Sequence, residues 1–427
     1  MIVRTGKTAM LPALVLCCLF LFSGIAGTQP GEGAFASLSR PGAGALDPRD
    51  IRYLGALRLP PDGEGDENAF AYGGEAMAFC QSGDSGKGSL YLTGHNWFTR
   101  VAEIGIPGPS PLRDPEALPQ ASLLQPFSDI RGPLFSRWTL EIPRVGLEAL
   151  DGKLFFCWGA HFEEASGWGT HGARSLDLSL PPPEAVCSVG GRQWVYATND
   201  YLFGIPPAWA AAHLPGYDLA SGRFRDGGWG GMGPALFALR SRDILEAGMD
   251  EAVRAVPLIL YDNSYTGDEG AKVTGYSHAD SFSGGAWVDT SAGSAVVFIG
   301  THGYGKTWYG FANGVRYPLG GNEEEVYPAV PPPPYEQRGW WNSDFRPVMT
   351  LYDPLDLARA AKGTLPASQV QPYALLDLSG YMLRGKLDTD MQLLGDAAYD
   401  RARALLYVQE LLADGDRPVI HVFRIGE

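Results

Sequence analysis

The stretch GGAWVDTSAGSAVVFIGTHGYGKTWYG, residues 284–310, decides the fold. It contains two apolar runs, residues 286–289 and 295–299, with the small residues 291–294 between them. Short β-prone runs joined by a turn rich in Gly and Ser are typical of a β-hairpin. We therefore predict two antiparallel strands in this stretch.

The same unit recurs along the chain. The clear further copies are GGEAMAF (73–79) with SLYLTGH (89–95), VGLEAL (145–150) with LFFCWGAH (154–161), and GDAAY (395–399) with LLYVQE (405–410). A less regular copy has its best hairpin at 195–198 and 201–205. The predicted third and fourth strands are 101–106 and 122–127, 174–180 and a part of 186–194, 235–239 and 257–261, and 348–352 and 373–378. Such repeated units indicate a repeat architecture.

The two ends of the chain complete one another. The last copy, which ends at Ile425, has three strands, whereas residues 51–59 stand alone before the first copy. We expect residues 53–59 to pair with 419–425 and so to close a ring. Four-stranded sheets arranged radially form a β-propeller. Division of the chain from Ile51 onward into five gives about 75 residues a blade; six blades would require one hidden in the Pro- and Gly-rich insert at 311–342.

Two short helices are predicted between third and fourth strands. Residues 241–248 form the first. The second follows Asp353, which is a favourable N-cap residue, with Pro354 in its first turn and Gly363 past its end.

Three phrases, YLFGIP (201–206), GPALFA (233–238) and RGWW (338–341), carry a family resemblance. The chain resembles secreted bacterial β-propeller-like proteins that are uncharacterised. The resemblance covers most of the chain after its N-terminal segment. It implies the fold and assigns no catalytic residues.

The N-terminus has the three-part pattern of a secretory signal peptide. Arg4 and Lys7 precede the apolar run 10–22, and the small residues 23–26 follow it. We expect a signal peptide at 1–26, a flexible leader at 27–48, and a single propeller domain at 49–427 in the periplasm or outside the cell. The net charge of −15 becomes about −17 on cleavage. Such an acidic chain argues against nucleic-acid partners, and no stable membrane anchor is expected after cleavage.

Three cysteines remain after cleavage, namely Cys80, Cys157 and Cys187. An odd number excludes a fully paired framework. Buried thiols are the first interpretation, and one disulfide with one free thiol is the alternative.

Three histidines occupy equivalent repeat positions. The second strands of their copies end at His95, His161 and His302, and the last copy has Gln409 and Glu410 there. Because second strands end on one face of a propeller, these side chains could gather at one rim and bind a divalent metal on the axis. Hydrogen bonds between neighbouring blades would explain the same recurrence.

Aromatic residues cluster near these positions. Aromatic faces beside polar groups suit sugar rings. The candidate ligand-binding residues are His95, Trp97, His161, His302, Tyr304, Trp308, Trp340, Trp341 and Glu410. Packing between blades is the structural alternative for many of them.

The candidate acids are Glu75, Glu163, Glu164, Asp200, Asp280 and Glu410. Two facing carboxylates would permit glycoside hydrolysis, and His302, Tyr304 and Arg338 would permit a lyase reaction. The sequence thus leads to three hypotheses. The first is a secreted propeller that binds a carbohydrate-like ligand at one mouth of its axis, the second a carbohydrate-active enzyme, and the third a protein-interaction propeller.

Overall fold

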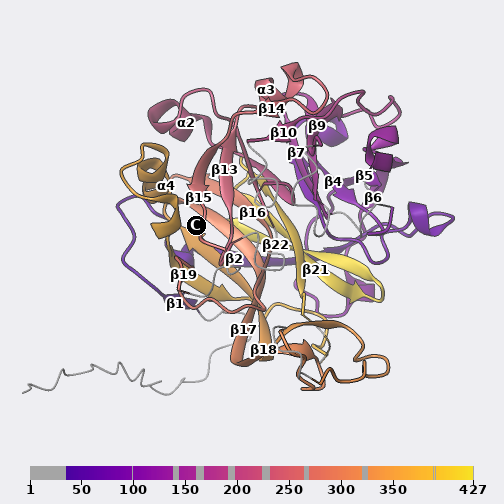
Figure 1. The fold of residues 1–427 in the computed structure, drawn as a ribbon. Coiled ribbons are helices and arrows are strands. Elements are labelled where there is room, and N and C mark those ends of the chain that lie inside the picture. The colour runs from indigo at the N-terminus through magenta and orange to yellow at the C-terminus, as the bar shows by residue number, and fades with distance from the viewer. Residues whose placement is uncertain are drawn as a thin grey trace, which may run out of the picture.

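Strand β2 (Ile51–Arg58) pairs antiparallel with β22 (Arg417–Ile425), so that the beginning of the chain completes the last blade. With β21 (Leu405–Asp414) and β20 (Leu394–Asp400) they form the sheet β2-β22-β21-β20. The predicted closure is confirmed, and the chain forms a five-bladed β-propeller (Figure 1). The computed structural model describes residues 35–98, 100–137, 144–159, 168–190, 198–223, 231–263, 269–319, 326–387, 389 and 391–426.

The first blade agrees with the prediction. Its antiparallel strands are β3 (Met77–Cys80), β4 (Ser89–Thr93), β5 (Val101–Gly105) and β6 (Ser122–Ser128), with the one-turn helix α1 (Gly83–Gly86) between β3 and β4. Met77 and Phe79 pack toward the last blade, and Ala78 and Cys80 pack toward the second. Because both faces of β3 are buried, the strand is a continuous apolar run rather than an alternating one.

The second blade is less regular than predicted. Its strands are β7 (Arg144–Leu150), β8 (Lys153–Gly159) and β9 (His171–Ser175). The third strand begins three residues before the predicted span 174–180 and ends at Ser175. It ends there because the carboxylate of Asp177 accepts a hydrogen bond from Ser179 N and turns the chain. At the blade's edge, the backbone of Cys187 forms an isolated antiparallel β-bridge with that of His171. Beyond it, β10 (Ser188–Val189) pairs in parallel with β14 (Ala252–Val253).

The third blade corrects one assignment. Its strands are β11 (Tyr201–Gly204), β12 (Leu219–Gly222), β13 (Leu236–Leu239) and β15 (Val256–Ile259). Residues 201–205 were expected to be the second strand, but they form the first. The true second strand has the sequence LASG, which lacks the large apolar residues that indicate a strand. Helix α2 (Pro207–His213) joins the two, and residues 195–197 lie outside the described ranges.

The fourth blade contains the opening hairpin. Its strands are β16 (Ser281–Thr290), β17 (Gly293–Phe311), β18 (Arg338–Tyr352) and β19 (Pro372–Asp377). A fifth strand, β1 (Phe35–Ser37), pairs with β19, and Leu46 is fully buried. Residues 35–48, expected to be a flexible leader, therefore lie against this blade where the structure describes them.

Both predicted helices are present. Helix α3 (Ser241–Glu246) lies between β13 and β15. Helix α4 (Pro354–Ala361) lies between β18 and β19, and its N-cap Asp353 accepts a hydrogen bond from Leu355 N. Short 3-10 turns occur at Pro48–Asp50, Asp66–Asn68, Pro115–Ala117, Gly132–Arg137 and Ala367–Gln369. Within the described residues, no helix has the length and apolar character that a membrane span needs.

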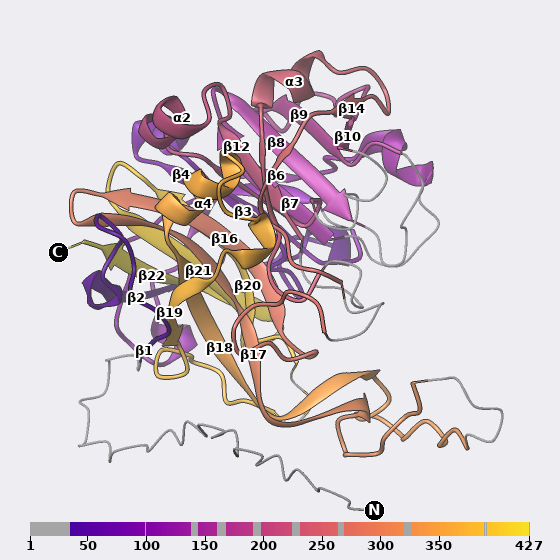
Figure 2. The ribbon, with the colours of Figure 1, turned by 60° about the vertical axis from the view of Figure 1, so that its left-hand side comes forward.

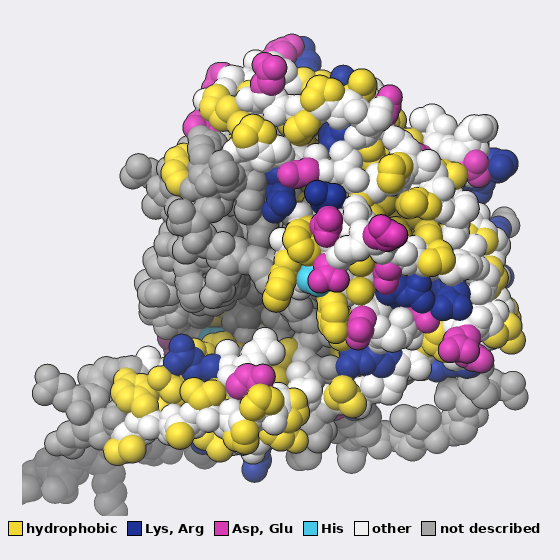
Figure 3. Space-filling model, turned by 90° about the vertical axis from the view of Figure 1, so that its right-hand side faces the viewer, with side chains coloured by type: hydrophobic (Ala, Val, Ile, Leu, Met, Phe, Trp, Pro, Cys, Tyr) yellow, Lys and Arg dark blue, Asp and Glu magenta, His cyan; other side chains and the backbone are white. Residues whose placement is uncertain are grey.

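Strands β17 and β18 extend far beyond their blade. Trp308 lies opposite Trp341 and Tyr309 opposite Trp340, so cross-strand aromatic pairs continue the hairpin. We call residues 304–342 the arm; Figure 2 shows it projecting from the body. Its ends were expected to belong to an irregular insert, but Phe311 and residues 338–342 are in strands. Hydrophobic side chains gather on its surface (Figure 3).

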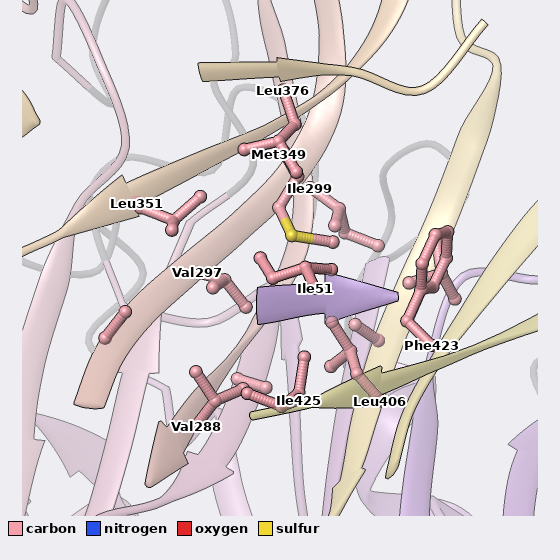
Figure 4. Close-up of a cluster of buried hydrophobic side chains, with 14 of the residues drawn as sticks. Ile51, Val288, Val297, Ile299, Met349, Leu351, Leu376, Leu406, Phe423 and Ile425 are labelled. Carbon is pink, nitrogen blue, oxygen red and sulfur yellow. The ribbon is translucent and has the colours of Figure 1, made fainter. Parts of the chain in front are cut away.

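The innermost strands of the five blades form a closed ring. Each of β3, β7, β11, β16 and β20 contacts the next, and β20 contacts β3. Apolar side chains fill the space between blades. Figure 4 shows Val297, Met349 and Leu351 of the fourth blade meeting Leu406 and Ile425 of the fifth. The three cysteines are buried free thiols, and burial raises the pKa of Cys187 to about 12.

The last and first blades pack so closely that one added methyl group is expected to lower the stability of the fold. A Cβ atom at Gly395 would collide with the carbonyl oxygen of Gly74. We expect Gly395→Ala to lower the free energy of unfolding by about 2–3 kcal/mol, because overpacked cores must shift rigid backbone. Urea unfolding measures this change. The matched control is Gly108→Ala, where a Cβ meets nothing within 4 Å; equal stability of the two variants would contradict the prediction.

Candidate functional site

The five inner strands begin at the same end of the axis, which we call the mouth. Asp200 and Asp280 directly precede β11 and β16, Glu75 lies two residues before β3, and Arg144 opens β7. Glu75 interacts electrostatically with both Arg144 and Asp200. The mouth therefore combines carboxylates and a guanidinium from successive blades.

Glu75 has the properties of a proton donor. Its Oε2 atom is buried and has no hydrogen-bond partner in the described part of the chain, although the residue is partly exposed. Burial raises its pKa to about 7, while Arg144 opposes that rise and Asp200 adds to it. Near neutral pH the side chain therefore exists both as acid and as carboxylate.

Asp200 has a different environment. It is 3% exposed, and its Oδ2 atom lies 3.5 Å from Nε of Arg223. Arg223 also donates a hydrogen bond to Asn199 Oδ1 over 3.1 Å. A Cβ atom at Gly159 would collide with Asp200 Oδ1, so the glycine leaves space for this carboxylate. Two carboxylates in unlike environments are the arrangement that separates the roles of acid and base.

Two more carboxylates lie deeper in the ring. Asp396, which is fully buried, accepts hydrogen bonds from Met77 N over 3.0 Å and Ala397 N over 2.7 Å, and burial raises its pKa. Burial also raises the pKa of Glu148 to about 8, against the attraction of Arg401. These groups hold neighbouring strands together.

Sequence reasoning selected Glu75 and Asp200 but missed Arg144, Arg223 and Glu148. The signal for the acids was present in the sequence. An Asp or Glu lies one or two residues before three of the five inner strands, and Asp396 is the third residue of a fourth. The arginines carry no such signal, because Arg144 approaches Glu75 only when two blades meet and Arg223 approaches Asp200 only when β11 and β12 pair.

Exposed aromatic side chains lie on two loops of the first blade: the segment before β3, which also contains Glu75, and the connection from β4 to β5. Tyr72 is 49% exposed and Trp97 is 68% exposed. His95 lies between them, edge-on to each ring at centroid distances of 5.5 and 5.6 Å, and contacts Phe98 in the same way. We call Tyr72, His95, Trp97 and Phe98 the aromatic rim.

His302 is held by an acid of the mouth. Its Nδ1 atom lies 2.8 Å from Asp280 Oδ1, which also accepts a hydrogen bond from Gly303 N. Tyr304 packs edge-on against the imidazole ring at 4.5 Å. This contact joins His302, Tyr304 and Asp280, three of the predicted residues, within one blade.

Glu410 belongs to a buried hydrogen-bonded chain. Its Oε2 atom lies 2.8 Å from His421 Nε2, and His421 Nδ1 lies 3.0 Å from the hydroxyl of Tyr53. Its two oxygens also accept hydrogen bonds from Leu383 N and Arg384 N. Within the described contacts, this residue therefore organises a loop.

The arm tryptophans differ from one another. Trp341, expected in a surface loop, is 1% exposed in β18 and donates its indole N–H to Gly310 O, so it has no face for a ligand. Trp308 donates its indole N–H to Phe311 O. Trp340 stacks on His278 with centroids 4.3 Å apart. Trp308 and Trp340 keep part of their surface exposed.

His161, Glu163 and Glu164 lie outside the described residues. Among the residues that are described, no group of three or more His, Cys, Asp and Glu side chains is placed to hold a metal ion. The metal set of His95, His161 and His302 therefore stays a prediction.

The chain has a weak structural similarity to three solved structures of other proteins. No protein-family profile and no curated protein sequence matches the chain. A candidate glycosidase from Bacteroides thetaiotaomicron has a TM-score of 0.37 and 10% identity, over 78% of this chain and 81% of its own. A glycosyl hydrolase from Bacteroides ovatus has a TM-score of 0.38 and 10% identity, over 90% and 94%.

A third solved structure comes from work on the GH130 family of mannoside phosphorylases, which contains glycoside hydrolases that target β-1,2 mannosidic linkages in Candida mannan. It has a TM-score of 0.35 and 11% identity, over 90% of this chain and 99% of its own. These likenesses concern the fold.

Proposed function

We propose that the propeller binds a carbohydrate-like ligand at the mouth of its axis, in the periplasm or outside the cell. The observation that carries this proposal is the exposed aromatic rim, whose Tyr72 lies three residues before Glu75 in the segment that leads into β3. Exposed Trp and Tyr faces suit the C–H faces of a sugar ring, and nearby carboxylates and guanidinium groups suit its hydroxyl groups. Tyr72 and Trp97 supply the faces, and Glu75 and Arg144 supply polar groups.

Hydrolysis of the bound glycan is the second candidate function, and the environment of Glu75 favours it. A carboxyl group with a pKa of about 7 can donate a proton to a leaving-group oxygen. Asp200, ion-paired with Arg223, would serve as the base or nucleophile. Glu75 lies two residues before β3 and Asp200 directly before β11, so inner strands, which are rigid elements of the fold, position both residues.

A glycan array with the purified chain tests binding. We expect Trp97→Ala to weaken binding of the best glycan roughly five- to tenfold, because a stacked ring contributes about 0.5–1.5 kcal/mol beyond its area. Trp97→Phe is the matched control, since it keeps an aromatic face, and it should retain most of the affinity. If no glycan binds, or if Trp97→Ala binds as the wild type does, the interaction propeller becomes the better hypothesis.

A further inference from the structure

A cavity lies between the fourth and fifth blades. It has a volume of about 300 Å³, at the lower end of the usual range for ligand pockets. Residues 344–347 of β18 form one wall, and the connection from β19 to β20 forms the other with Met382, Arg384, Lys386 and Leu393. The cavity thus has apolar surface and several charges.

The wall made by the connection is fixed before any ligand arrives. The guanidinium of Arg113 donates hydrogen bonds to the carbonyl oxygens of Gly380, Tyr381 and Met382 over 2.6–3.1 Å. From the other side, Glu410 accepts the N–H groups of Leu383 and Arg384. A wall held in this way loses little conformational entropy on binding.

The opposite wall presents an oriented guanidinium. Arg346 stacks on Tyr304 with its Cζ atom 4.7 Å from the ring centroid. It is also ion-paired with Asp344 at 3.0 Å and Asp377 at 3.3 Å. Stacking and paired carboxylates fix the plane of the guanidinium, which is the geometry that recognises a carboxylate.

The charges of the lining favour an anion. Arg346, Arg384 and Lys386 are cationic, and Asp344, which pairs with Arg346 and Lys386, is anionic. Glu410 also lines the cavity, but its oxygens accept the two N–H groups and face His421. The lining therefore has three cations and two carboxylates, and Asp377, outside the lining, also pairs with Arg346.

We propose that this cavity is a second ligand site, for a small sugar-sized molecule with one carboxylate group, such as a hexuronate. The carboxylate would pair with Arg346 and Lys386, and the ring would lie against Pro347, Met382 and Leu393. This site lies at the same end of the axis as the mouth, between the fourth and fifth blades, and involves neither Glu75 nor the aromatic rim, so it does not depend on the function proposed there.

Calorimetric titration with sodium glucuronate tests the site, with neutral glucuronamide as the matched probe. We expect glucuronate to bind at least about tenfold more tightly than glucuronamide. Arg346→Gln should weaken glucuronate binding about tenfold, because a charge-assisted hydrogen bond is lost. Asp344→Asn should tighten it, because the competing carboxylate is removed. Opposite effects of two neighbouring substitutions cannot come from partial unfolding.

Arg359→Gln serves as the control, since Arg359 is also paired with an aspartate, Asp356, on helix α4. It should bind glucuronate as the wild type does. Equal binding of the two probes, no binding of either, or an unchanged affinity in Arg346→Gln would overturn the proposal. Trp97→Ala should leave this binding intact; if it abolishes binding whereas Arg346→Gln does not, the acid binds at the aromatic rim and the second site is refuted.

Discussion

Glu75→Gln is expected to lower kcat/KM for hydrolysis of an unactivated glycoside by roughly 10²–10⁴-fold, the usual contribution of a general acid. Glutamine keeps the shape of the side chain but cannot donate the proton that the leaving oxygen needs. The wild-type rate should fall as the pH rises through about 7, because the donor loses its proton there. A pH profile of kcat/KM measures both effects.

Leaving-group chemistry separates this role from a structural one. A dinitrophenyl glycoside needs no protonation to leave, so Glu75→Gln should hydrolyse it nearly as fast as the wild type. Glu148→Gln is the matched control, since Glu148 is also a partly exposed inner-strand acid with a raised pKa but lies away from the mouth. Equal loss on both substrates would show that Glu75 is not the general acid.

Glu148→Gln is expected to make the protein more stable at pH 8 than the wild type, by on the order of 3 kcal/mol, and to change little below pH 4.5. The pKa of Glu148 is raised from 4.5 to about 8 in the folded chain. Between these values the unfolded chain has released the proton and the folded chain has kept it. The wild type therefore loses stability as the pH rises through this window.

Glutamine removes that loss because it does not ionise, and its side-chain oxygen can still accept the hydrogen bond from the backbone of Gly204. Each unit of pKa shift corresponds to about 1.4 kcal/mol, and partial exposure of the residue reduces the full value. Urea unfolding at pH 5 and pH 8 measures the difference. Glu246→Gln, at an exposed position on α3, should give a profile parallel to that of the wild type. A parallel profile for Glu148→Gln would refute the prediction.

The strand pattern was accessible from the sequence where each strand has its own apolar signal. The strands predicted at 73–79 and 405–410 are present for this reason, as Met77–Cys80 and Leu405–Asp414, and so is the pairing that closes the ring. Leu219–Gly222 was missed because its residues are small, and only its pairing with β11 and β13 on either side makes it a strand. The arm was taken for an insert because Pro and Gly hide the cross-strand pairing of Trp308 with Trp341.

The sequence by itself determined the five-bladed propeller and the kinds of residue that reach its axis. Both follow from the local alternation of apolar side chains and from an unpaired strand at each end of the chain. Only the tertiary structure decided which acids have a shifted pKa and which have a charged partner. Glu75 acquires a raised pKa because burial and, to a smaller extent, Asp200 disfavour its charged form, and Asp200 acquires Arg223 as a partner because β11 and β12 pair. Desolvation and charge pairing depend on neighbours that are distant in the chain, and no local pattern records them.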